Sequence, residues 1–503
     1  MRRPSISRNL AIAGSLASFL VVATVAAAPG SPFTPVLPEG ARSRGPFRWL
    51  AELVGLGQVH GGALAAIGVL AAALAAGAFL LLLREAWRGT LRPRTILVLA
   101  VVYHLALLAL PLLFSRDVYS YAFYGKIAAT YHANPYVATP ADFPNDALAA
   151  LVGPKWFDTP AVYGPLWTQI SGLVVRAVGS VEGQIAAFRL IAIAASLGTL
   201  ALVRHLVRRV RPEREAFALA LLGANPVVLF QSVASGHNDL LVALGVAAAA
   251  ALVFARRELP AAAVLTLAAL VKAPAAIPLV LLVVAAIARR PDRERLRSLV
   301  AHGAVIGGLA LAATAPFLNR SDPTLGMLEL AGHEGWLAPS RFFRRLLDAV
   351  SGDTLGVLPR IVFPAVLLGA LFLVARELVR RVPVTPWLQG AAWGWGLLAL
   401  TLLGPVLLPW YLAWTLPVGW LLAGAARGVL IASSALLTLS QWTSEPARFE
   451  TAYDVNIWFG HYVLTPVAIG LLLWLLVDLR RRTRSGAPLQ DEPREVPADA
   501  GRR

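Results

Sequence analysis

The sequence consists largely of apolar runs of about 20 residues that alternate with short segments rich in arginine. A helical run of this length crosses the hydrocarbon core of a bilayer and satisfies its own backbone hydrogen bonds. Of the 503 residues, 57% are hydrophobic and 15% are charged, whereas soluble domains carry about 25% charged residues. We therefore expect an all-α polytopic membrane protein rather than several soluble domains.

The apolar runs predict about 12 membrane spans. We interpret the first run as a retained span rather than a cleaved leader, because it is as long as the others. Two shorter apolar pieces in residues 259–288 are broken at Lys272-Ala273-Pro274, which predicts a hairpin of short helices. The predicted spans lie near residues 9–29, 61–83, 95–114, 185–203, 215–231, 239–255, 299–317, 357–375, 387–404, 410–425, 428–443 and 462–479.

The arginine clusters predict the orientation of the chain, because short cytoplasmic loops carry an excess of Lys and Arg. With the arginine loops inside, both termini are cytoplasmic and residues 115–164 form a large exterior loop after the third span. Residues 165–181 then form a short exterior-side or re-entrant helix, because a further span would bring the basic segment 204–214 outside. Residues 1–484 are the transmembrane domain, and the polar residues 485–503 predict a disordered cytoplasmic tail.

Composition excludes several classes of function. The net charge of +17 comes mainly from arginines in loops between apolar runs, so no basic soluble domain is present to bind nucleic acid. The chain has no cysteine, which excludes disulfides, zinc–thiolate sites, iron–sulfur clusters and thiol catalysis. An alanine- and arginine-rich, lysine-poor composition suggests the plasma membrane of a bacterium, with membrane lipids as partners.

The large exterior loop contains a candidate general base and several tyrosines. Asp117 lies at the membrane boundary, where desolvation raises a carboxyl pKa and the neighbouring Arg116 opposes the shift. The other interpretation is an ordinary charge that caps the next helix. Residues 118–131 predict an amphipathic juxtamembrane helix whose aromatic residues, Tyr121 among them, form either a sugar platform or an interfacial belt. The sequence Tyr163-Gly164-Pro165 predicts a turn before the following helix.

Two polar groups interrupt apolar segments further along the chain. His237, Asn238 and Asp239 lie between two spans and form either a site or, at Asp239, a helix cap. A metal there would need further ligands, so we predict none. Lys272 is one of only three lysines, and a buried ammonium needs an anionic partner. That partner is a lipid phosphate, Asp117 or Asp239; the other interpretation is a lysine that snorkels to the membrane surface.

The second half of the chain contributes cationic and aromatic candidates. Arg341 belongs to an arginine-rich stretch of the predicted exterior loop 318–356, which is explained either by a bound anion such as phosphate or by solvated loop charges. Trp410 and Tyr411 open a predicted span on the exterior side, where they form either a substrate contact or an aromatic belt.

Six motifs follow one another along the chain: Asp117-Val118-Tyr119, Asn134-Pro135-Tyr136, Tyr163-Gly164-Pro165, Gly236-His237-Asn238-Asp239, Leu270-Val271-Lys272-Ala273-Pro274 and Pro409-Trp410-Tyr411-Leu412-Ala413-Trp414. In their order and spacing, these motifs resemble the GT-C superfamily of polytopic glycosyltransferases over residues 95–480. The similarity is greatest to actinobacterial polyprenyl-phosphate-mannose-dependent α-mannosyltransferases and to glycosyltransferase family 87. The resemblance implies a lipid-phosphate sugar donor and transfer on the exterior face. It also implies that the acidic residue of the first large exterior loop, here Asp117, is the catalytic base.

We therefore predict an enzyme that moves mannose from a polyprenyl-phosphate donor to a glycan or lipid-glycan acceptor, without a cofactor or metal ion. Lys272 and Arg341 are predicted to bind the donor phosphate. The alternatives are a pentosyl (arabinofuranosyl) transferase, a lipid or solute transporter, and a non-catalytic membrane scaffold; a transporter predicts internal repeats, which the sequence does not show. The predicted substrate contacts are Tyr121, Tyr163, His237, Asn238, Asp239, Trp410 and Tyr411.

Overall fold

The computed structural model describes residues 6–36, 47–318, 334–335, 337–352, 354–442 and 450–491. Within these ranges the regular structure is helical, apart from one isolated antiparallel bridge between Leu422 and Gln490. The all-α fold expected from the apolar runs is confirmed. The α-helices are α1 (Ile6–Ala27), α2 (Arg48–Leu53), α3 (Gly61–Trp87), α4 (Pro93–Leu107), α5 (Asp117–Ala129), α6 (Pro165–Ala177), α7 (Val181–Val210), α8 (Glu215–Gly223), α9 (Asp239–Phe254), α10 (Glu258–Val271), α11 (Ala276–Ala288), α12 (Asp292–Thr314), α13 (Pro339–Ser351), α14 (Leu358–Arg380), α15 (Pro386–Leu403), α16 (Gly424–Ser440), α17 (Glu450–Phe459) and α18 (Thr465–Ser485).

Short 3₁₀ and π segments connect these helices. The segments are η1 (Leu56–Gln58), η2 (Pro140–Asp142), η3 (Ala149–Leu151), η4 (Pro154–Trp156), η5 (Pro212–Arg214), the π-helix η6 (Val227–Val233), η7 (Ala273–Ala275), η8 (Ala315–Phe317), η10 (Pro409–Trp414), η11 (Leu416–Leu421) and the π-helix η13 (Gly460–Leu464).

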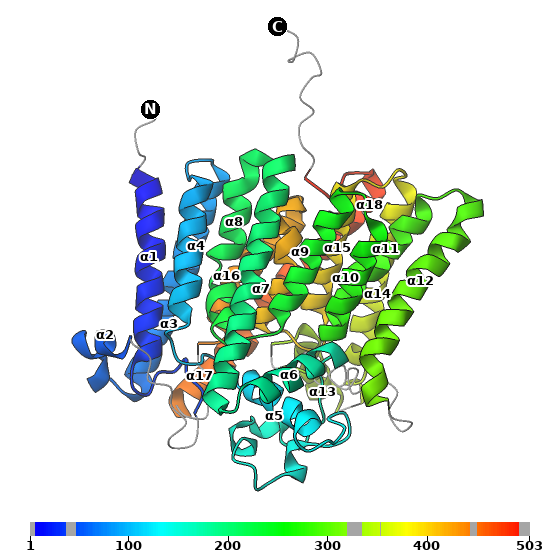
Figure 1. The fold of residues 1–503 in the computed structure, drawn as a ribbon. Helices are drawn as coiled ribbons and strands as arrows, with labels where there is room; N and C mark the ends of the chain where they lie inside the picture. Colours follow the sequence, from blue (N-terminus) through cyan, green and yellow to red (C-terminus); the bar gives the residue numbers. More distant parts are fainter. Residues whose placement is uncertain are drawn as a thin grey trace.

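The long helices stand side by side in a bundle, and α5, α6 and α13 lie in a layer across its lower end (Figure 1). Among the described residues, seven helices are long and apolar enough to cross a membrane, which confirms the membrane character. Several further apolar helices are shorter, and the total of about 12 spans stays a prediction. The seven are Ile6–Ala27, Gly61–Trp87, Val181–Val210, Pro212–Val233, Asp292–Phe317, Leu358–Arg380 and Asp454–Ser485.

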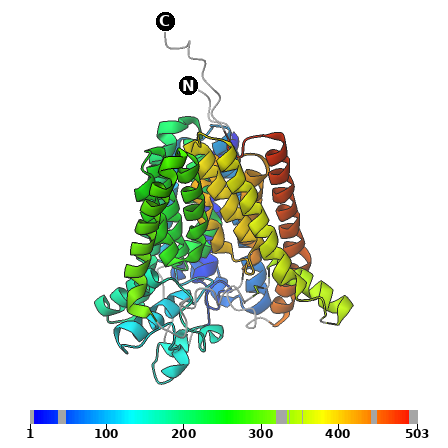
Figure 2. The same cartoon turned by 90° about the vertical axis from the view of Figure 1, so that its right-hand side faces the viewer.

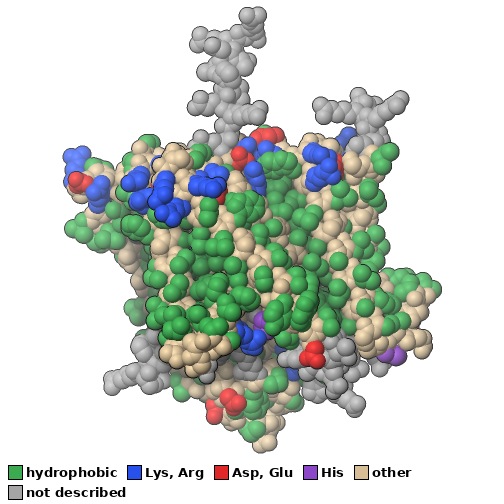
Figure 3. All heavy atoms as spheres, turned by 180° about the vertical axis from the view of Figure 1, so that it is seen from behind, with side chains coloured by type: hydrophobic (Ala, Val, Ile, Leu, Met, Phe, Trp, Pro, Cys, Tyr) green, Lys and Arg blue, Asp and Glu red, His purple; other side chains and the backbone are tan. Residues whose placement is uncertain are grey.

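The two ends of the bundle differ in charge. Lys and Arg side chains gather along one edge, with a broad apolar band beside it (Figure 3). The start of α1 and the end of α18 lie at this arginine-rich end, whereas the layer containing α5 lies at the other end (Figure 2). We call these the arginine-rich face and the α5 layer.

The predicted hairpin of short helices is present as α10 and α11. Arg289 Nη1 lies 2.6 Å from Glu258 Oε1, so the start of α10 and the end of α11 are joined at the arginine-rich face. The 14 residues of α10 extend for about 21 Å, less than the bilayer core of about 30 Å. The hairpin tip at Lys272 therefore lies within the bundle, where the α5 layer meets it.

The helix predicted over residues 118–131 is not amphipathic. α5 is buried on every side from Val118 to Gly125, because α6 and α7 pack against it. A Cβ atom on Gly125 would lie 2.6 Å from the backbone carbonyl carbon of Ser171, so glycine permits this close helix contact. The helix expected in residues 165–181 is present as α6, which has 13 residues and packs on α5, and its exterior-side or re-entrant position stays a prediction.

The segment predicted as an α-helical span over residues 410–425 is instead formed by the consecutive 3₁₀ helices η10 and η11. Proline at positions 409 and 417 favours short helical turns over a continuous α-helix. At about 2 Å per residue, residues 409–421 still cover about 26 Å. The surrounding helices bury most of this segment, which makes such irregular backbone tolerable at membrane depth.

Residues 486–491, which were predicted to belong to a disordered tail, are instead ordered against the bundle. Leu489 is fully buried, and Gln490 pairs with Leu422. Asp491 accepts a hydrogen bond from Arg427 at 2.8 Å, so the chain is docked on the bundle up to this residue. Residues 492–503 lie outside the described part of the chain.

Candidate active site

Four segments that are distant in sequence meet between the bundle and the α5 layer. They are the start of α5 with Asp117, the turn before α9 with His237, the hairpin tip with Lys272, and η10 with Trp410. The turn before α9 begins at Gly236, whose φ of +70° favours glycine. A Cβ atom on Gly236 would also lie 2.7 Å from Val118 Cγ1. Glycine at this turn therefore lets α5 approach and brings Asp117 to His237.

Asp239 is the enclosed carboxylate of this site. Its side chain is 0% exposed, and Lys272 Nζ lies 2.9 Å from both of its oxygens. The indole N–H of Trp414 donates to Asp239 Oδ1 at 2.7 Å. No side-chain hydrogen bond caps α9, so the interpretation of Asp239 as a simple helix cap is not supported. The negative charge of Asp239 is therefore compensated within the protein.

Lys272 stands among three aromatic rings as well as beside Asp239. Its Nζ atom lies 5.0 Å from the ring centre of Tyr411 and 5.9 Å from those of Tyr163 and Trp414. Such cation–π contacts stabilise a buried ammonium. An ammonium has three N–H donors, and two of them are engaged by Asp239. One donor thus remains for another acceptor in the site.

Asp117 is the accessible carboxylate. Its side chain is 16% exposed, and its Oδ2 atom lies 3.4 Å from His237 Nδ1. Burial raises the pKa of the Asp117 carboxyl, but His237, the charge of Lys272 and the Ser115 hydroxyl together hold this pKa below the ordinary value. The raised pKa expected from sequence is therefore wrong. Asp117 is the first residue of α5 and makes no side-chain cap bond.

His237 and Asn238 present buried polar atoms to the same region. The His237 ring is 0% exposed and stacks on Trp410 with ring centres 3.9 Å apart. Within the described residues, His237 Nε2 and both polar side-chain atoms of Asn238 have no hydrogen-bond partner. Leaving a buried polar atom unpaired costs about 1–3 kcal/mol. These atoms are therefore suited to hydroxyl groups of a bound substrate.

Tyr163 is fixed at the site by the glycine that follows it. The backbone N–H of Gly164 donates to the Val271 carbonyl at 3.0 Å, beside the hairpin tip. A Cβ atom at Gly164 would lie 2.1 Å from the Leu270 carbonyl oxygen, so the contact requires glycine. The Tyr163-Gly164-Pro165 turn predicted from sequence therefore also docks the α5 layer on α10.

Tyr121 packs edge-on against Tyr163 with ring centres 4.8 Å apart. Burial raises the pKa of both tyrosine hydroxyls well above their ordinary value, and the Asp117 charge adds to this shift. Both side chains therefore stay protonated and keep an O–H donor.

Within the described part of the chain, none of the contacts given above for this cluster involves Arg341. It belongs to α13, which packs on α14, α15 and α18, and its charge acts on His461. The segment before α13 is anchored close to η10, because Gly335 N–H donates to the Pro405 carbonyl at 2.9 Å. The neighbouring Arg344 is engaged by Glu334 at 2.5 Å. The assignment of Arg341 to the donor phosphate stays a prediction.

Sequence reasoning missed Trp414 as a site residue. In a 3₁₀ helix, residues three apart lie above one another, and Tyr411 and Trp414 accordingly stack with ring centres 4.3 Å apart. This stack directs the Trp414 indole to Asp239. The sequence shows Tyr411 and Trp414 three residues apart, but an α-helix was expected there, so this spacing was not interpreted as a stacked pair of rings.

Comparison with known proteins defines the class. The chain matches the family model described as "Alpha-(1->6)-mannopyranosyltransferase, N-terminal domain" over residues 11–288, which is more than half of its length. It is 28% identical over 432 residues to alpha-(1->6)-mannopyranosyltransferase A of Mycobacterium tuberculosis (strain ATCC 25618 / H37Rv), covering 81% of this chain and 79% of that protein. No solved structure matches.

With its apolar helices, the chain is a membrane glycosyltransferase. It belongs to the alpha-(1->6)-mannopyranosyltransferase family. The resemblance drawn from the motifs is thereby confirmed, and so is the expectation of an enzyme. The matched region includes Asp117, His237, Asp239 and Lys272, whereas η10 lies beyond it.

Proposed function

We propose that this enzyme transfers a mannosyl residue from a polyprenyl-phosphate donor to a hydroxyl group of a glycan or lipid-glycan acceptor, with Asp117 as the general base. The observation that carries the proposal is the contrast between two neighbouring carboxylates. Asp239 is fully enclosed and neutralised by Lys272, whereas Asp117 is 16% exposed. The alpha-(1->6) linkage follows by analogy with the name of the relative.

Asp117 suits the role of base through its position and its charge. Its lowered pKa keeps the carboxylate ionised at neutral pH, ready to accept a proton. As the acceptor oxygen attacks the anomeric carbon, its proton passes to Asp117 and the bond from that carbon to the phosphate oxygen breaks. The electron pair leaves with polyprenyl phosphate, a fair leaving group because its charge is delocalised. A single displacement on a β-linked donor gives an α-linked product.

The remaining residues position the substrates and stabilise the leaving phosphate. The third N–H of Lys272 and, in our proposal, the guanidinium of Arg341 meet the charge that develops on the phosphate. His237 Nε2 and the Asn238 side chain receive sugar hydroxyls, since the protein supplies them with no partner among the described residues. The ring of Trp410 extends this surface through its stack with His237. No cofactor or metal ion takes part in this scheme.

We place the reaction on the exterior face of a bacterial plasma membrane, with both termini in the cytoplasm. The site lies toward the α5 layer, and the positive-inside rule assigns the opposite, arginine-rich face to the cytoplasm (Figure 3). A lipid-linked donor suits this location, because its sugar is presented at the membrane surface.

The donor class is tested by transfer assays on the full chain in purified membranes. Radiolabelled polyprenyl-phosphate mannose and a nucleotide-linked mannose are each supplied with a lipid-glycan acceptor. We expect transfer from the lipid-linked donor alone, giving an α-linked product. Transfer from the nucleotide sugar would contradict the proposal, and exclusive transfer from polyprenyl-phosphate arabinofuranose would establish the pentosyl alternative instead.

A further inference from the structure

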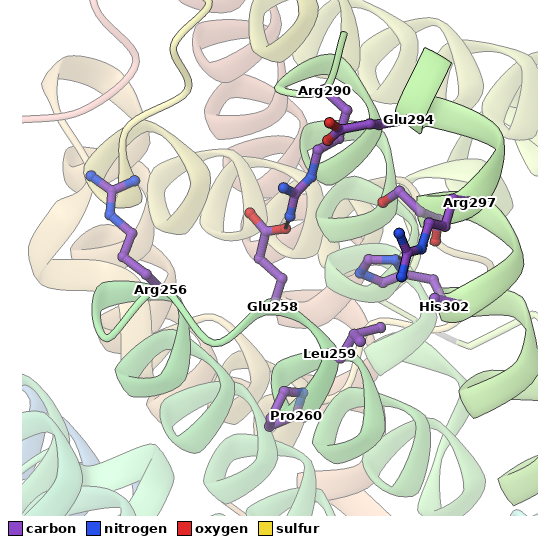
Figure 4. A pocket seen from close by; sticks show the side chains of 10 residues that line it. Arg256, Glu258, Leu259, Pro260, Arg290, Glu294, Arg297 and His302 are labelled. Atoms are coloured by element: carbon purple, nitrogen blue, oxygen red, sulfur yellow. Dashed lines mark hydrogen bonds and ion pairs between the residues drawn. The ribbon is translucent and has the colours of Figure 1, made fainter. Parts of the chain in front are cut away.

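A polar pocket opens at the arginine-rich face, at the end of the bundle opposite the candidate active site. It lies where α10 begins, α11 ends and α12 begins, and its cavity volume is about 520 Å³ (Figure 4). This volume is within the range of small-molecule and lipid-headgroup sites. The polar residues that line it are Arg256, Glu258, Arg290, Glu294, Arg297 and His302.

The pocket carries a surplus of positive charge. Three arginines and two glutamates line it. One of the glutamates, Glu258, already forms ion pairs with Arg289 at 2.6 Å and with Arg290 at 3.3 Å. Arg256 and Arg297 make no ion pair with any carboxylate in the described part of the chain. Two guanidinium groups are thus available to an anion, and such groups match the geometry of phosphate oxygens.

His302 is the residue that makes this pocket a built site. α12 is exposed along most of its length, and its buried residues are His302 and Ala313. His302 is 3% exposed, and its Nδ1 atom is 2.8 Å from the Ser298 carbonyl oxygen. Its Nε2 atom is buried without a partner among the described residues. With Nδ1 donating to that carbonyl, the lone pair of Nε2 is open to a hydroxyl group of a bound headgroup.

The surroundings of the pocket indicate which phosphate compound it takes. Leu259 lines the pocket on α10 and is exposed, and Leu299 on α12, which follows the lining residue Ser298, is exposed as well. Exposed apolar side chains beside a basic pocket match a ligand that has acyl chains as well as a charged headgroup. Basic pockets between helices on the cytoplasmic side are suited to anionic lipid headgroups. A free phosphate ion has no apolar part that could contact these exposed leucine side chains.

We propose that this pocket binds the phosphate headgroup of an anionic phospholipid in the leaflet at the arginine-rich face. The shared chemistry is phosphate oxygens held by Arg297 and Arg256, with a hydroxyl group of the headgroup donating to His302 Nε2. The acyl chains lie along the exposed apolar faces of α10 and α12. This site is separate from the proposed catalytic cluster, and its occupant is a resident lipid rather than a substrate.

The proposal is tested by native mass spectrometry of the full chain in neutral detergent. Dioleoyl phosphatidylglycerol, dioleoyl phosphatidylcholine and inorganic phosphate are titrated separately. We expect phosphatidylglycerol to bind about tenfold more tightly than phosphatidylcholine. Arg297→Ala should weaken phosphatidylglycerol binding about tenfold, because a charge-assisted hydrogen bond is lost. Arg293→Ala is the matched control, since this arginine is on the same helix and does not line the pocket.

A second variant, at His302, makes the test independent of whether Arg297→Ala folds. His302→Leu should also weaken phosphatidylglycerol binding and leave phosphatidylcholine binding unchanged. Equal binding of the two lipids would overturn the proposal, as would equal effects of Arg297→Ala and Arg293→Ala. Inorganic phosphate that binds as tightly as phosphatidylglycerol would also overturn it, because the site would then recognise a free anion.

Discussion

The two ends of the α10–α11 hairpin each carry a basic residue paired with a carboxylate, in opposite surroundings. At the tip, the Lys272 side chain is 10% exposed and Asp239 is 0% exposed. At the open end, Glu258 is shared between Arg289, which is 13% exposed, and Arg290, which is 46% exposed and forms the pair compared here. The tip pair is also surrounded by aromatic rings, whereas the open end borders the pocket at the arginine-rich face.

The α10–α11 hairpin therefore contains two kinds of ion pair, which have different roles. In the buried Lys272–Asp239 pair, neither charge can exchange its partner for water. The pair therefore fixes the relative positions of α9 and the hairpin tip. A half-exposed pair exchanges with solvent and ligands, so it contributes little to stability. The tip is thus suited to hold catalytic geometry, and the open end is suited to bind an anion.

The largest expected effect is the loss of the tip pair. Lys272→Met leaves Asp239 as an uncompensated buried charge and should lower the free energy of unfolding by about 3–5 kcal/mol. The double variant Lys272→Met, Asp239→Asn should recover much of this loss. Arg290→Ala at the open end should cost less than about 1 kcal/mol. Equilibrium unfolding in detergent measures all three variants, and equal losses at the two ends would refute the distinction.

A smaller effect is expected where the α5 layer docks on the tip. Gly164→Ala introduces a Cβ atom 2.1 Å from the Leu270 carbonyl, so the turn must move. We expect a loss of about 1–3 kcal/mol in stability, together with reduced transfer, because Tyr163 moves away from Lys272. Gly179→Ala is the control, since nothing lies within 4 Å of its Cβ position. Equal behaviour of these two variants would show that the docking is unimportant.

The smallest effect concerns pH. Because the pKa of Asp117 lies below its ordinary value, its carboxylate stays ionised as pH rises from about 6 to about 8. The corresponding stability is present above the pKa of the unfolded chain and is lost as pH falls through the lower folded pKa. We therefore expect kcat/KM to vary less than about twofold through Asp117 in this window. A decrease in kcat/KM through Asp117 as the pH falls toward 6 would contradict this prediction, because it would show that the carboxyl is protonated there.

The sequence predicted the hairpin because an apolar segment with arginines at both ends was interrupted by Lys272 and Pro274. It also identified most residues that the structure brings together at the tip. It could not select the partner of Lys272, since Asp117, Asp239 and a lipid phosphate were all consistent with its position. Only the three-dimensional arrangement of α9 and the tip assigns Asp239.

Two expectations failed for physical reasons. The pKa of Asp117 was expected to rise because its desolvation was considered with Arg116 alone, whereas His237 and Lys272, distant in sequence, outweigh burial. The segment after Pro409 was interpreted as an α-helix from its apolar composition, which does not distinguish α from 3₁₀ geometry. Both errors arise from long-range packing that a local pattern does not contain.

The central claim is that Asp117, and not its enclosed neighbour, accepts the proton during transfer. The most direct test compares initial rates of mannosyl transfer for wild type, Asp117→Asn and Asp158→Asn, an exposed aspartate in the same layer. The account predicts that Asp117→Asn stays folded and loses roughly a hundredfold to ten-thousandfold in rate, while Asp158→Asn behaves as wild type. A folded Asp117→Asn enzyme with the wild-type rate would contradict the account.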